Sequence, residues 1–361
     1  MKVHHSGQWR RAVLALLSAL LVGALVAACG ASEGGGSSGG GGDEEKAAGG
    51  KPSSLRVAYQ SIPNGATIVK NQKWLEDSLG IPVEWQSFDS GANVNRAVAS
   101  GSVDVGLAGS SPVSNGIATG LPYKVPWIYA VIGDAEQLVA KESSGVRDVK
   151  DLEGKKVAAP FGSTTHYALL TALTDAGLDL GKVDVIDLEP DDIVAAWSRD
   201  DIDAAYVWNP SLGKLVDDGG TLLLSSAELA EQGTLTGDLA VVRTEFAEQY
   251  PDVVSGWLEQ ENRAVKLIKS DPEGAAAIVA KELQLPPADA AEQMEGLIFL
   301  DATEQLSPEY LGTPGQPGKL AEQLTTTATF LKEQKLIDRL PEAAEFDEAV
   351  DSSFLEKAAG S

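Results

Sequence analysis

The stretch VDVGLAGSSP, residues 103–112, joins a short apolar run to two serines and a proline. A second stretch of the same kind, KVAAPFGSTTHY, occupies residues 156–167. Each apolar run predicts a buried strand, and the hydroxyl-rich segment after it predicts a helix start, with Pro112 at the first helical position. Unpaired backbone N–H groups and the helix dipole give a helix N-terminus partial positive charge. Two such ends that face one cleft would therefore bind an anion.

The rest of the chain alternates short apolar runs with helix-like segments. This alternation predicts an α/β fold in which mainly parallel sheets are flanked by helices. In such sheets ligands bind at the carboxyl ends of the strands, which is where both hydroxyl-rich stretches lie. The expected strands cover residues 55–59, 83–86, 103–107, 128–132, 137–141, 156–159, 183–187, 204–208 and 239–243.

The 361-residue length exceeds what a single hydrophobic core usually holds, which predicts two lobes. An internal similarity supports lobes of related design, because residues 98–106 align loosely with residues 197–205. Each segment contains a helix end, a polar turn and a strand that opens with an aliphatic residue followed by Asp. Residues 136–141 and 238–243 are expected to cross between the lobes. The predicted first lobe comprises residues 54–142 and 237–361, and the predicted second lobe comprises residues 143–236.

The N-terminal segment, residues 1–28, has the layout of an export signal. Arg10 and Arg11 precede an apolar run that is short and rich in small residues, and the run ends at Cys29. It resembles a bacterial lipoprotein signal peptide, which implies lipid attachment at Cys29 and a location at the extracytoplasmic face of the cell membrane, in the periplasm or on the cell surface. Residues 29–53 are mostly Gly and Ser and predict a flexible linker. An uncleaved anchor and a plain secretory signal are the alternatives.

The composition excludes several classes of function. Cys29 is the only cysteine, so the chain forms no internal disulfide and offers no cysteine metal site. Of the three histidines only His166 lies beyond the predicted signal, which excludes a multi-histidine site, and we expect neither a metal nor a cofactor. Without the three basic residues of the signal, 25 basic residues face 53 acidic ones, a net charge of −28. A chain this acidic is unsuited to nucleic acid, so the anion must be held by local groups.

Five segments carry a further pattern, namely residues 88–92, 99–101, 109–112, 163–167 and 195–208. In these segments, and more loosely from about Leu55 to Phe354, the chain resembles the periplasmic taurine-binding proteins of ABC importers, which belong with the binders of aliphatic sulfonates and nitrate. The resemblance implies a two-lobed periplasmic-binding-protein fold of type II, whose lobes close on a ligand in the cleft between them. It also implies a monomer without catalytic activity, with an ABC permease and ATPase as partners.

For the sulfonate group, the resemblance points to the two helix starts. A sulfonate is a permanent monoanion with three acceptor oxygens, so its ideal site presents only donors. The hydroxyls of Ser110, Ser111, Thr164 and Thr165 supply such donors together with the nearby backbone N–H groups. His166 is a possible further donor. We therefore predict that these five side chains bind the ligand.

For the ammonium group of taurine, the resemblance implies an acidic acceptor at Asp238. Trp208 is predicted to contribute a cation–π contact, and Gln60 and Glu136, at matching strand ends, are further candidates. The chain departs from the taurine-binding proteins at one point. They carry a tryptophan two residues beyond the acid, whereas this chain has Ala240, which predicts a roomier amine end.

Each predicted site residue also has a purely structural interpretation. Ser111 and Ser163 are typical helix N-caps, His166 and Trp208 are compatible with core packing, and Asp238 is compatible with an ion pair between the lobes. Other ligands also remain open, namely an alkyl sulfonate, nitrate or a thiamine-precursor pyrimidine. An enzyme on the same fold and a surface scaffold are the alternatives from other functional classes.

Overall fold

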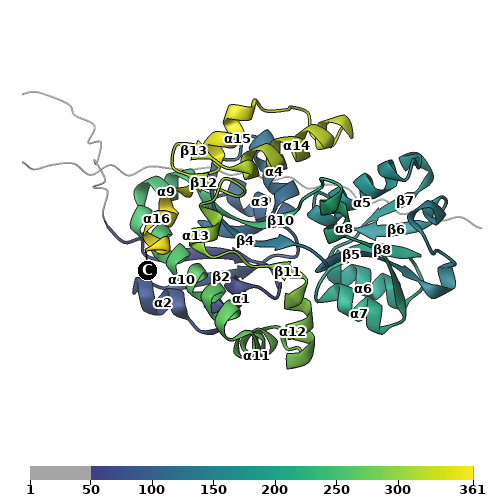
Figure 1. Ribbon diagram of the computed structural model, residues 1–361, viewed down its shortest axis with the longest axis horizontal. Coiled ribbons are helices and arrows are strands. Elements are labelled where there is room, and N and C mark those ends of the chain that lie inside the picture. The colour runs from purple at the N-terminus through teal and green to yellow at the C-terminus, as the bar shows by residue number, and fades with distance from the viewer. Residues whose placement is uncertain (1–49, 361) are drawn as a thin grey trace, which may run out of the picture. The chain divides into compact units, whose positions relative to one another are not determined.

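The computed structural model describes residues 50–360 (Figure 1). The predicted signal, the lipid-attachment site Cys29 and residues 29–49 of the predicted linker lie outside this range. Near its start, Lys51 Nζ donates a hydrogen bond of 2.6 Å to the carbonyl oxygen of Leu79. Within the described range no helix has the length and apolar character needed to cross a membrane.

The first sheet has six strands in the order β11-β4-β10-β3-β1-β2. Strands β1, β2 and β3 are parallel, whereas β10 runs antiparallel to both β3 and β4. The bounds are β1 (Leu55–Tyr59), β2 (Val83–Ser87), β3 (Val105–Gly109), β4 (Tyr123–Ile132), β10 (Gly237–Arg243) and β11 (Leu297–Ile298).

The second sheet has five strands in the order β7-β6-β8-β5-β9. Strands β6, β7 and β8 are parallel, and β5 runs antiparallel to both β8 and β9. Each sheet thus has three parallel strands beside one antiparallel strand, β10 in the first and β5 in the second. The bounds are β5 (Glu136–Lys141), β6 (Lys156–Ala159), β7 (Asp184–Asp187), β8 (Ala204–Trp208) and β9 (Gly220–Ser225).

Helices flank both sheets, and a small hairpin of β12 (Gly312–Thr313) and β13 (Gln316–Pro317) lies in the C-terminal part. The helices that follow strands of the second sheet are α5 (Thr164–Asp175), α6 (Pro190–Ser198), α7 (Ser211–Asp217) and α8 (Ser226–Glu231). The others are α1 (Gly65–Asn71), α2 (Trp74–Leu79), α3 (Gly91–Ala99), α4 (Ser110–Ala118), α9 (Thr244–Gln249), α10 (Pro251–Ser270), α11 (Pro272–Leu283), α12 (Pro287–Glu295), α13 (Ala302–Gln305), α14 (Lys319–Glu333), α15 (Ala343–Ala349) and α16 (Leu355–Ala359).

Both faces of the second sheet are buried. Leu138 and Tyr206 pack with side chains of α5 and α8, whereas their neighbours Val139 and Val207 pack with side chains of α6 and α7. Successive side chains of a strand point to opposite faces, so two helical layers require apolar residues at every position. This is why the strands read as continuous apolar runs in the sequence.

The predicted α/β alternation and the two separate sheets are confirmed, but several details of the prediction differ from the structure, among them the following. The strand that starts at Glu136 pairs with β8 and β9, so it belongs to the second sheet, whereas the predicted lobe boundary placed residues up to 142 in the first lobe. Strand β9 was not expected, because it pairs only with β5 and most of its side chains are partly exposed. Pro112 is the third residue of α4 rather than the first, because Gly109 is the N-cap.

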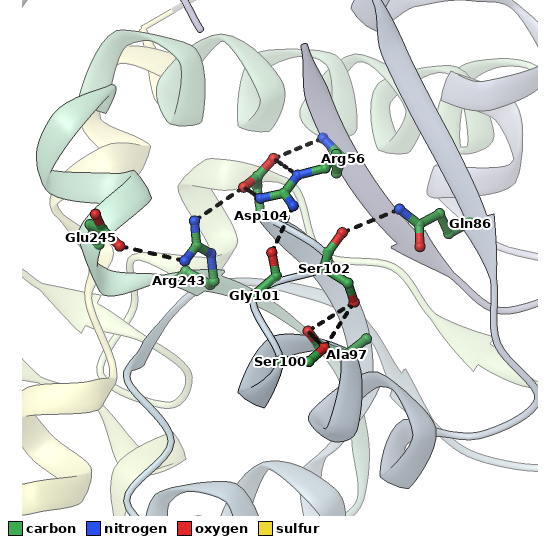
Figure 2. A network of polar contacts seen from close by, with 9 residues as sticks. All are labelled: Arg56, Gln86, Ala97, Ser100, Gly101, Ser102, Asp104, Arg243 and Glu245. Carbon is green, nitrogen blue, oxygen red and sulfur yellow. Dashed lines mark hydrogen bonds and ion pairs between the residues drawn. The ribbon is translucent and has the colours of Figure 1, made fainter. Parts of the chain in front are cut away.

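The internal similarity of the sequence corresponds to two equivalent aspartates, each just before the parallel strand that adjoins the antiparallel strand of its sheet. Asp104 accepts a hydrogen bond of 3.0 Å from the backbone N–H of Arg56, and Asp203 accepts one of 2.9 Å from the backbone N–H of Lys156. Asp104 also pairs with the guanidinium groups of Arg56 and Arg243 (Figure 2). The two sheets therefore share a local design that only the first reinforces with arginines.

Candidate functional site

The N-termini of α4 and α5 approach each other, one from each sheet. Helix α4 begins directly after β3, and four residues separate the end of β6 from the start of α5 at Thr164. A Cβ atom at Gly109 would lie only 2.6 Å from Cγ2 of Thr164, so glycine permits this close approach. The N–H groups in the first turn of a helix have no acceptor within the helix. The two ends therefore converge on a region of partial positive potential, as the sequence predicts.

A small cavity lies at this junction, and a second small cavity adjoins it. The two cavities share Ile62, Glu136, Trp208 and Asp238. Nearly all the lining residues lie at strand ends or in the first turns that follow them, where this class of sheet binds ligands. The first cavity is lined by Gln60, Ile62, Gly91, Gly109, Pro112, Glu136, Ser163, Thr164, Trp208 and Asp238.

Two buried carboxyl groups define the chemistry of this cavity. Glu136 and Asp238 are 4% and 6% exposed, and Thr164 Oγ1 donates a hydrogen bond of 2.5 Å to Glu136 Oε1. Glu136 Oε2 is buried without a partner. Burial raises the pKa of Glu136 to about 8 and the pKa of Asp238 to about 7. No Lys, Arg or His lines either cavity among the described residues, so these acids lack a cation of their own.

Gln60 and Trp208 line the cavity together with the two carboxyl groups. Gln60 Nε2 donates a hydrogen bond of 3.1 Å to the carbonyl oxygen of Leu107, which leaves its amide oxygen as an acceptor. Trp208 is the last residue of β8 and pairs directly with Glu136 of the neighbouring strand β5. The indole ring and the carboxyl group therefore lie side by side. Carboxyl groups, an amide oxygen and an aromatic ring together suit a small cation.

The predicted residues of α4 lie beside this cavity rather than in its lining. Ser110 and Ser111 are buried in the first turn of α4, and neither side chain lines the cavity. Ser110 Oγ accepts a hydrogen bond of 3.3 Å from the backbone N–H of Gly237 and faces a separate cavity under α14. Helix α4 thus meets the cavity through Gly109 and Pro112.

The side chains of Thr165 and His166 also turn away from the cavity. Ser163 is the N-cap of α5, since its Oγ accepts from the backbone N–H of His166, and it lies 2.8 Å from Thr165 Oγ1. The imidazole of His166 stacks on Phe161 with 4.3 Å between ring centroids. Burial lowers the pKa of His166 to about 4, so the ring is neutral at neutral pH.

The structure therefore divides the predicted site residues into two groups. One group lines a single cavity, and the ligand roles of its members stay predictions. This group consists of Gln60, Glu136, Thr164, Trp208 and Asp238. The remaining four, Ser110, Ser111, Thr165 and His166, supply the first turns of the two helices that point at it.

Sequence reasoning did not identify Ile62 and Gly91 as lining residues. A Cβ at Gly91 would lie 2.6 Å from Pro112 Cγ, so glycine is needed where α3 starts beside α4. Both residues follow parallel strands at the edge where Gln60 and Gly109 lie, and this position was the available signal. Among residues 50–360 no group of three or more His, Cys, Asp or Glu is placed to hold a metal.

Ala240, where the resemblance predicts extra room, is fully buried in β10. It pairs with Trp127 of β4, whose ring is also fully buried. Residues that pair across two strands share a face of the sheet. Ala240 and Trp127 therefore lie on one face of the first sheet, and the roomier amine end stays a prediction.

Known proteins resemble this chain in sequence and in fold. Residues 69–275 match the NMT1/THI5-like family. The taurine-binding periplasmic protein of Escherichia coli (strain K12) is 33% identical over 309 residues, which cover 84% of this chain and 93% of the relative. A putative aliphatic sulfonates-binding protein of Bacillus subtilis (strain 168) is 29% identical over a region that covers 62% of this chain and 67% of that relative. The solved alkanesulfonate-binding protein SsuA from Xanthomonas axonopodis pv. citri bound to MOPS has a TM-score of 0.69 at 24% identity, over 84% of this chain and 99% of that structure.

Proposed function

The chain belongs to the NMT1/THI5-like family and has a periplasmic-binding-protein fold, and we propose that it is the substrate-binding component of an ABC importer for taurine. Relatives that cover most of the chain carry the names of taurine- and aliphatic-sulfonate-binding proteins. Permease and ATPase subunits of the importer are the expected partners. The protein would capture the ligand and present it to the permease, without chemistry.

The observation that carries this proposal is that one cavity has groups suited to an anion on one side and groups suited to a cation on the other. The N-termini of α4 and α5 offer backbone N–H groups to an anion. The opposite wall offers Asp238, Glu136 and Gln60 to a cation, and no basic side chain competes among the described lining residues. A nitrogen-free sulfonate or nitrate would leave both acids without a cation. A molecule that carries a sulfonate and an ammonium satisfies both ends.

The available contacts are sufficient for tight binding of so small a molecule. Hydrogen bonds to charged groups contribute roughly 1.5–3 kcal/mol each. Micromolar affinity requires about 8 kcal/mol, so four or five such contacts suffice after the entropy cost of binding. Two helix termini and two acids supply that number.

A larger sulfonate is the second candidate ligand. The adjoining cavity adds the apolar side chains of Pro63, Ile132 and Leu297 beyond the two acids. A ligand with a bulkier group on its nitrogen would extend into this space. The enzyme alternative has less support, because no histidine lines either cavity within residues 50–360 and burial lowers the pKa of His166 to about 4, which keeps its ring neutral.

Calorimetry tests the proposed ligand directly. Taurine, isethionate, an alkyl sulfonate and sulfate are titrated separately into the chain that starts at residue 30. We expect taurine to bind most tightly, and at a hundredfold its dissociation constant it should stabilise the fold by about 2.7 kcal/mol. Absence of taurine binding together with tight binding of the alkyl sulfonate would reject taurine as the ligand. Absence of any ligand-dependent change in melting temperature would favour the scaffold alternative.

We further propose that Cys29 carries a lipid that holds the protein at the extracytoplasmic face of the membrane. The proposal rests on the resemblance of residues 1–28 to a lipoprotein signal. Fractionation of cells that produce the full chain tests it. The unaltered protein should sediment with membranes, whereas Cys29→Ser should appear in the soluble extracytoplasmic fraction. Sedimentation of both proteins with membranes would reject the lipid anchor.

A further inference from the structure

Two helix N-caps, one from each lobe, leave their own helices uncapped. Ser90 precedes α3 and Glu189 precedes α6, and both have extended backbone conformations typical of an N-cap. Neither side chain accepts a hydrogen bond from a backbone N–H of its own helix. A serine at this position normally accepts from the backbone N–H two or three residues later, which stabilises the helix by about 1 kcal/mol. The side chain of Ser90 instead bonds to a residue of the other lobe.

The side chains of Ser90, Asn93 and Glu189 form a hydrogen-bonded contact between the lobes. Glu189 Oε1 accepts from Ser90 Oγ at 3.2 Å and from Asn93 Nδ2 at 2.9 Å. Asn93 Nδ2 also lies 3.1 Å from Ser90 Oγ, which ties the two donors together. Ser90 is only 1% exposed. Ser90 and Asn93 follow β2 of the first sheet, whereas Glu189 follows β7 of the second.

The electrostatics of this contact suit a bond that forms and breaks. The N-termini of α3 and α6 both favour a carboxylate at this point. Arg96 bonds to Asn93 Oδ1 and strengthens the polarity of that amide. Burial, with Asp89 and Asp187 nearby, raises the pKa of Glu189, and its Oε2 is buried without a partner. The contact is therefore favourable, but one carboxyl oxygen of Glu189 is buried without a hydrogen bond. This cost lowers the net stability of the contact and makes it reversible.

The contact lies at the edge of the cavity without lining it. Gly91, the residue after Ser90, lines the cavity, and a Cβ at Gly162 of the second lobe would lie 3.7 Å from Ala92 Cβ. The lobes thus meet where α3 begins. We propose that Ser90, Asn93 and Glu189 form an interlobe latch, which holds the cleft closed and sets how long a ligand is retained without touching that ligand. The retention part of this inference rests on the proposed function.

Closure in the absence of ligand provides the first test. In the full chain carrying Cys29→Ser, cysteines for spin labels replace Glu84 and Asp184, exposed residues on the edge strands β2 and β7. Glu189→Ala should shift the distance distribution away from the closed arrangement. Asp192→Ala, which removes an exposed acid from the first turn of α6, should leave the distribution unchanged. Coincident distributions for Glu189→Ala and the unaltered chain overturn the latch, whatever the ligand is.

Ligand release provides the second test. Glu189→Ala should accelerate dissociation of taurine and of a nitrogen-free sulfonate by the same factor, about tenfold. Glu189→Gln retains an acceptor oxygen and should keep most of the retention. A double-mutant cycle of Glu189→Ala with Asn93→Ala should show that the two losses are not additive. Unequal losses for the two ligands would mean that Glu189 contacts the ligand, and additive losses would mean that no latch exists.

Discussion

Asp104 and Asp238 are buried aspartates at opposite ends of the same pair of strands, and their surroundings differ completely. Asp104 precedes β3 and pairs with Arg56 and Arg243 (Figure 2). Asp238 lies in β10 opposite Gly109, where β3 ends. It faces a cavity with no basic side chain among its described lining residues, and burial raises its pKa to about 7.

The comparison separates a carboxylate that stabilises the fold from one that is kept for a ligand. A buried charge is stable only when it is paired and hydrogen-bonded. The chain supplies the partners of Asp104 itself. The partner of Asp238 has to come from outside, and until it arrives the acid is held partly protonated. Binding sites commonly retain such groups although they destabilise the unliganded protein.

The largest effect expected from this comparison is on taurine affinity. Asp238→Asn removes the charge that would pair with the ammonium in a desolvated site, so we expect a loss of about 3–5 kcal/mol of binding free energy. Affinity for a nitrogen-free sulfonate should be unchanged or improved. Calorimetry with both ligands measures the difference. Equal losses would show that Asp238 does not interact with the amine.

The reciprocal change, Asp104→Ala, should affect stability and not binding. It removes the carboxylate that Arg56 and Arg243 share, although Arg56 keeps its bond to the Gly101 carbonyl oxygen and Arg243 its ion pair with Glu245. Since both guanidinium groups are partly exposed, we expect a loss of about 2–4 kcal/mol in the free energy of unfolding. Urea denaturation of the unliganded protein measures it. Asp203→Ala, at the equivalent position without arginines, is the matched control and should cost less. A similar loss for both variants would mean that the arginines add nothing.

A smaller effect should distinguish the two neighbouring threonines of α5. Thr164 lines the cavity and contacts Glu136, whereas Thr165 pairs with Ser163. Thr164→Ala should weaken taurine binding by about 1–2 kcal/mol, and Thr165→Ala by less, although the sequence alone assigned both hydroxyls to the sulfonate. Thr164→Ser should restore binding. A larger loss for Thr165→Ala would show that α5 rotates when the ligand binds.

The smallest expected effect is the pH dependence. The folded-state pKa values of Asp238 and Glu136, about 7 and about 8, lie above those of unfolded carboxyl groups. Their contribution to the stability of the unliganded protein is therefore complete at low pH and is lost as the pH rises through 7 and 8. Taurine affinity should rise over the same range, by about tenfold, because the ammonium favours ionised acids. Calorimetry between pH 6 and 8 in two buffers should show proton release. Affinity that falls with pH would contradict this assignment.

Local patterns made much of the fold predictable. An apolar run, a hydroxyl-rich turn and an apolar stripe are contiguous in sequence, so the starts of α4 and α5 could be placed before the structure was known. The predicted periplasmic-binding-protein fold is likewise confirmed. The lobe boundary at residue 142 was wrong because β5 is assigned by its pairing with β8 and β9, and such long-range pairing leaves no local signal.

The orientation of side chains within a helix start could not be read from the sequence. Four hydroxyl side chains are equivalent in the sequence pattern, namely Ser110, Ser111, Thr164 and Thr165. Of these only Thr164 lines the cavity. The packing of each helix on its sheet sets the rotation of its first turn, and this rotation has no signal in the sequence. Glu189 gave no signal at all, since its partners lie about a hundred residues earlier in the chain.

By itself the sequence determined the order of strands and helices, the two anion-attracting helix ends and the acidic residues available for a cation, because each depends on neighbouring residues or on composition. Only the tertiary structure decided that Glu136 and Asp238 share one cavity, that His166 turns away from it and that the lobes meet at Ser90 and Glu189. Those outcomes depend on how two sheets pack and on which groups burial deprives of water, and both are properties of residues distant in the chain.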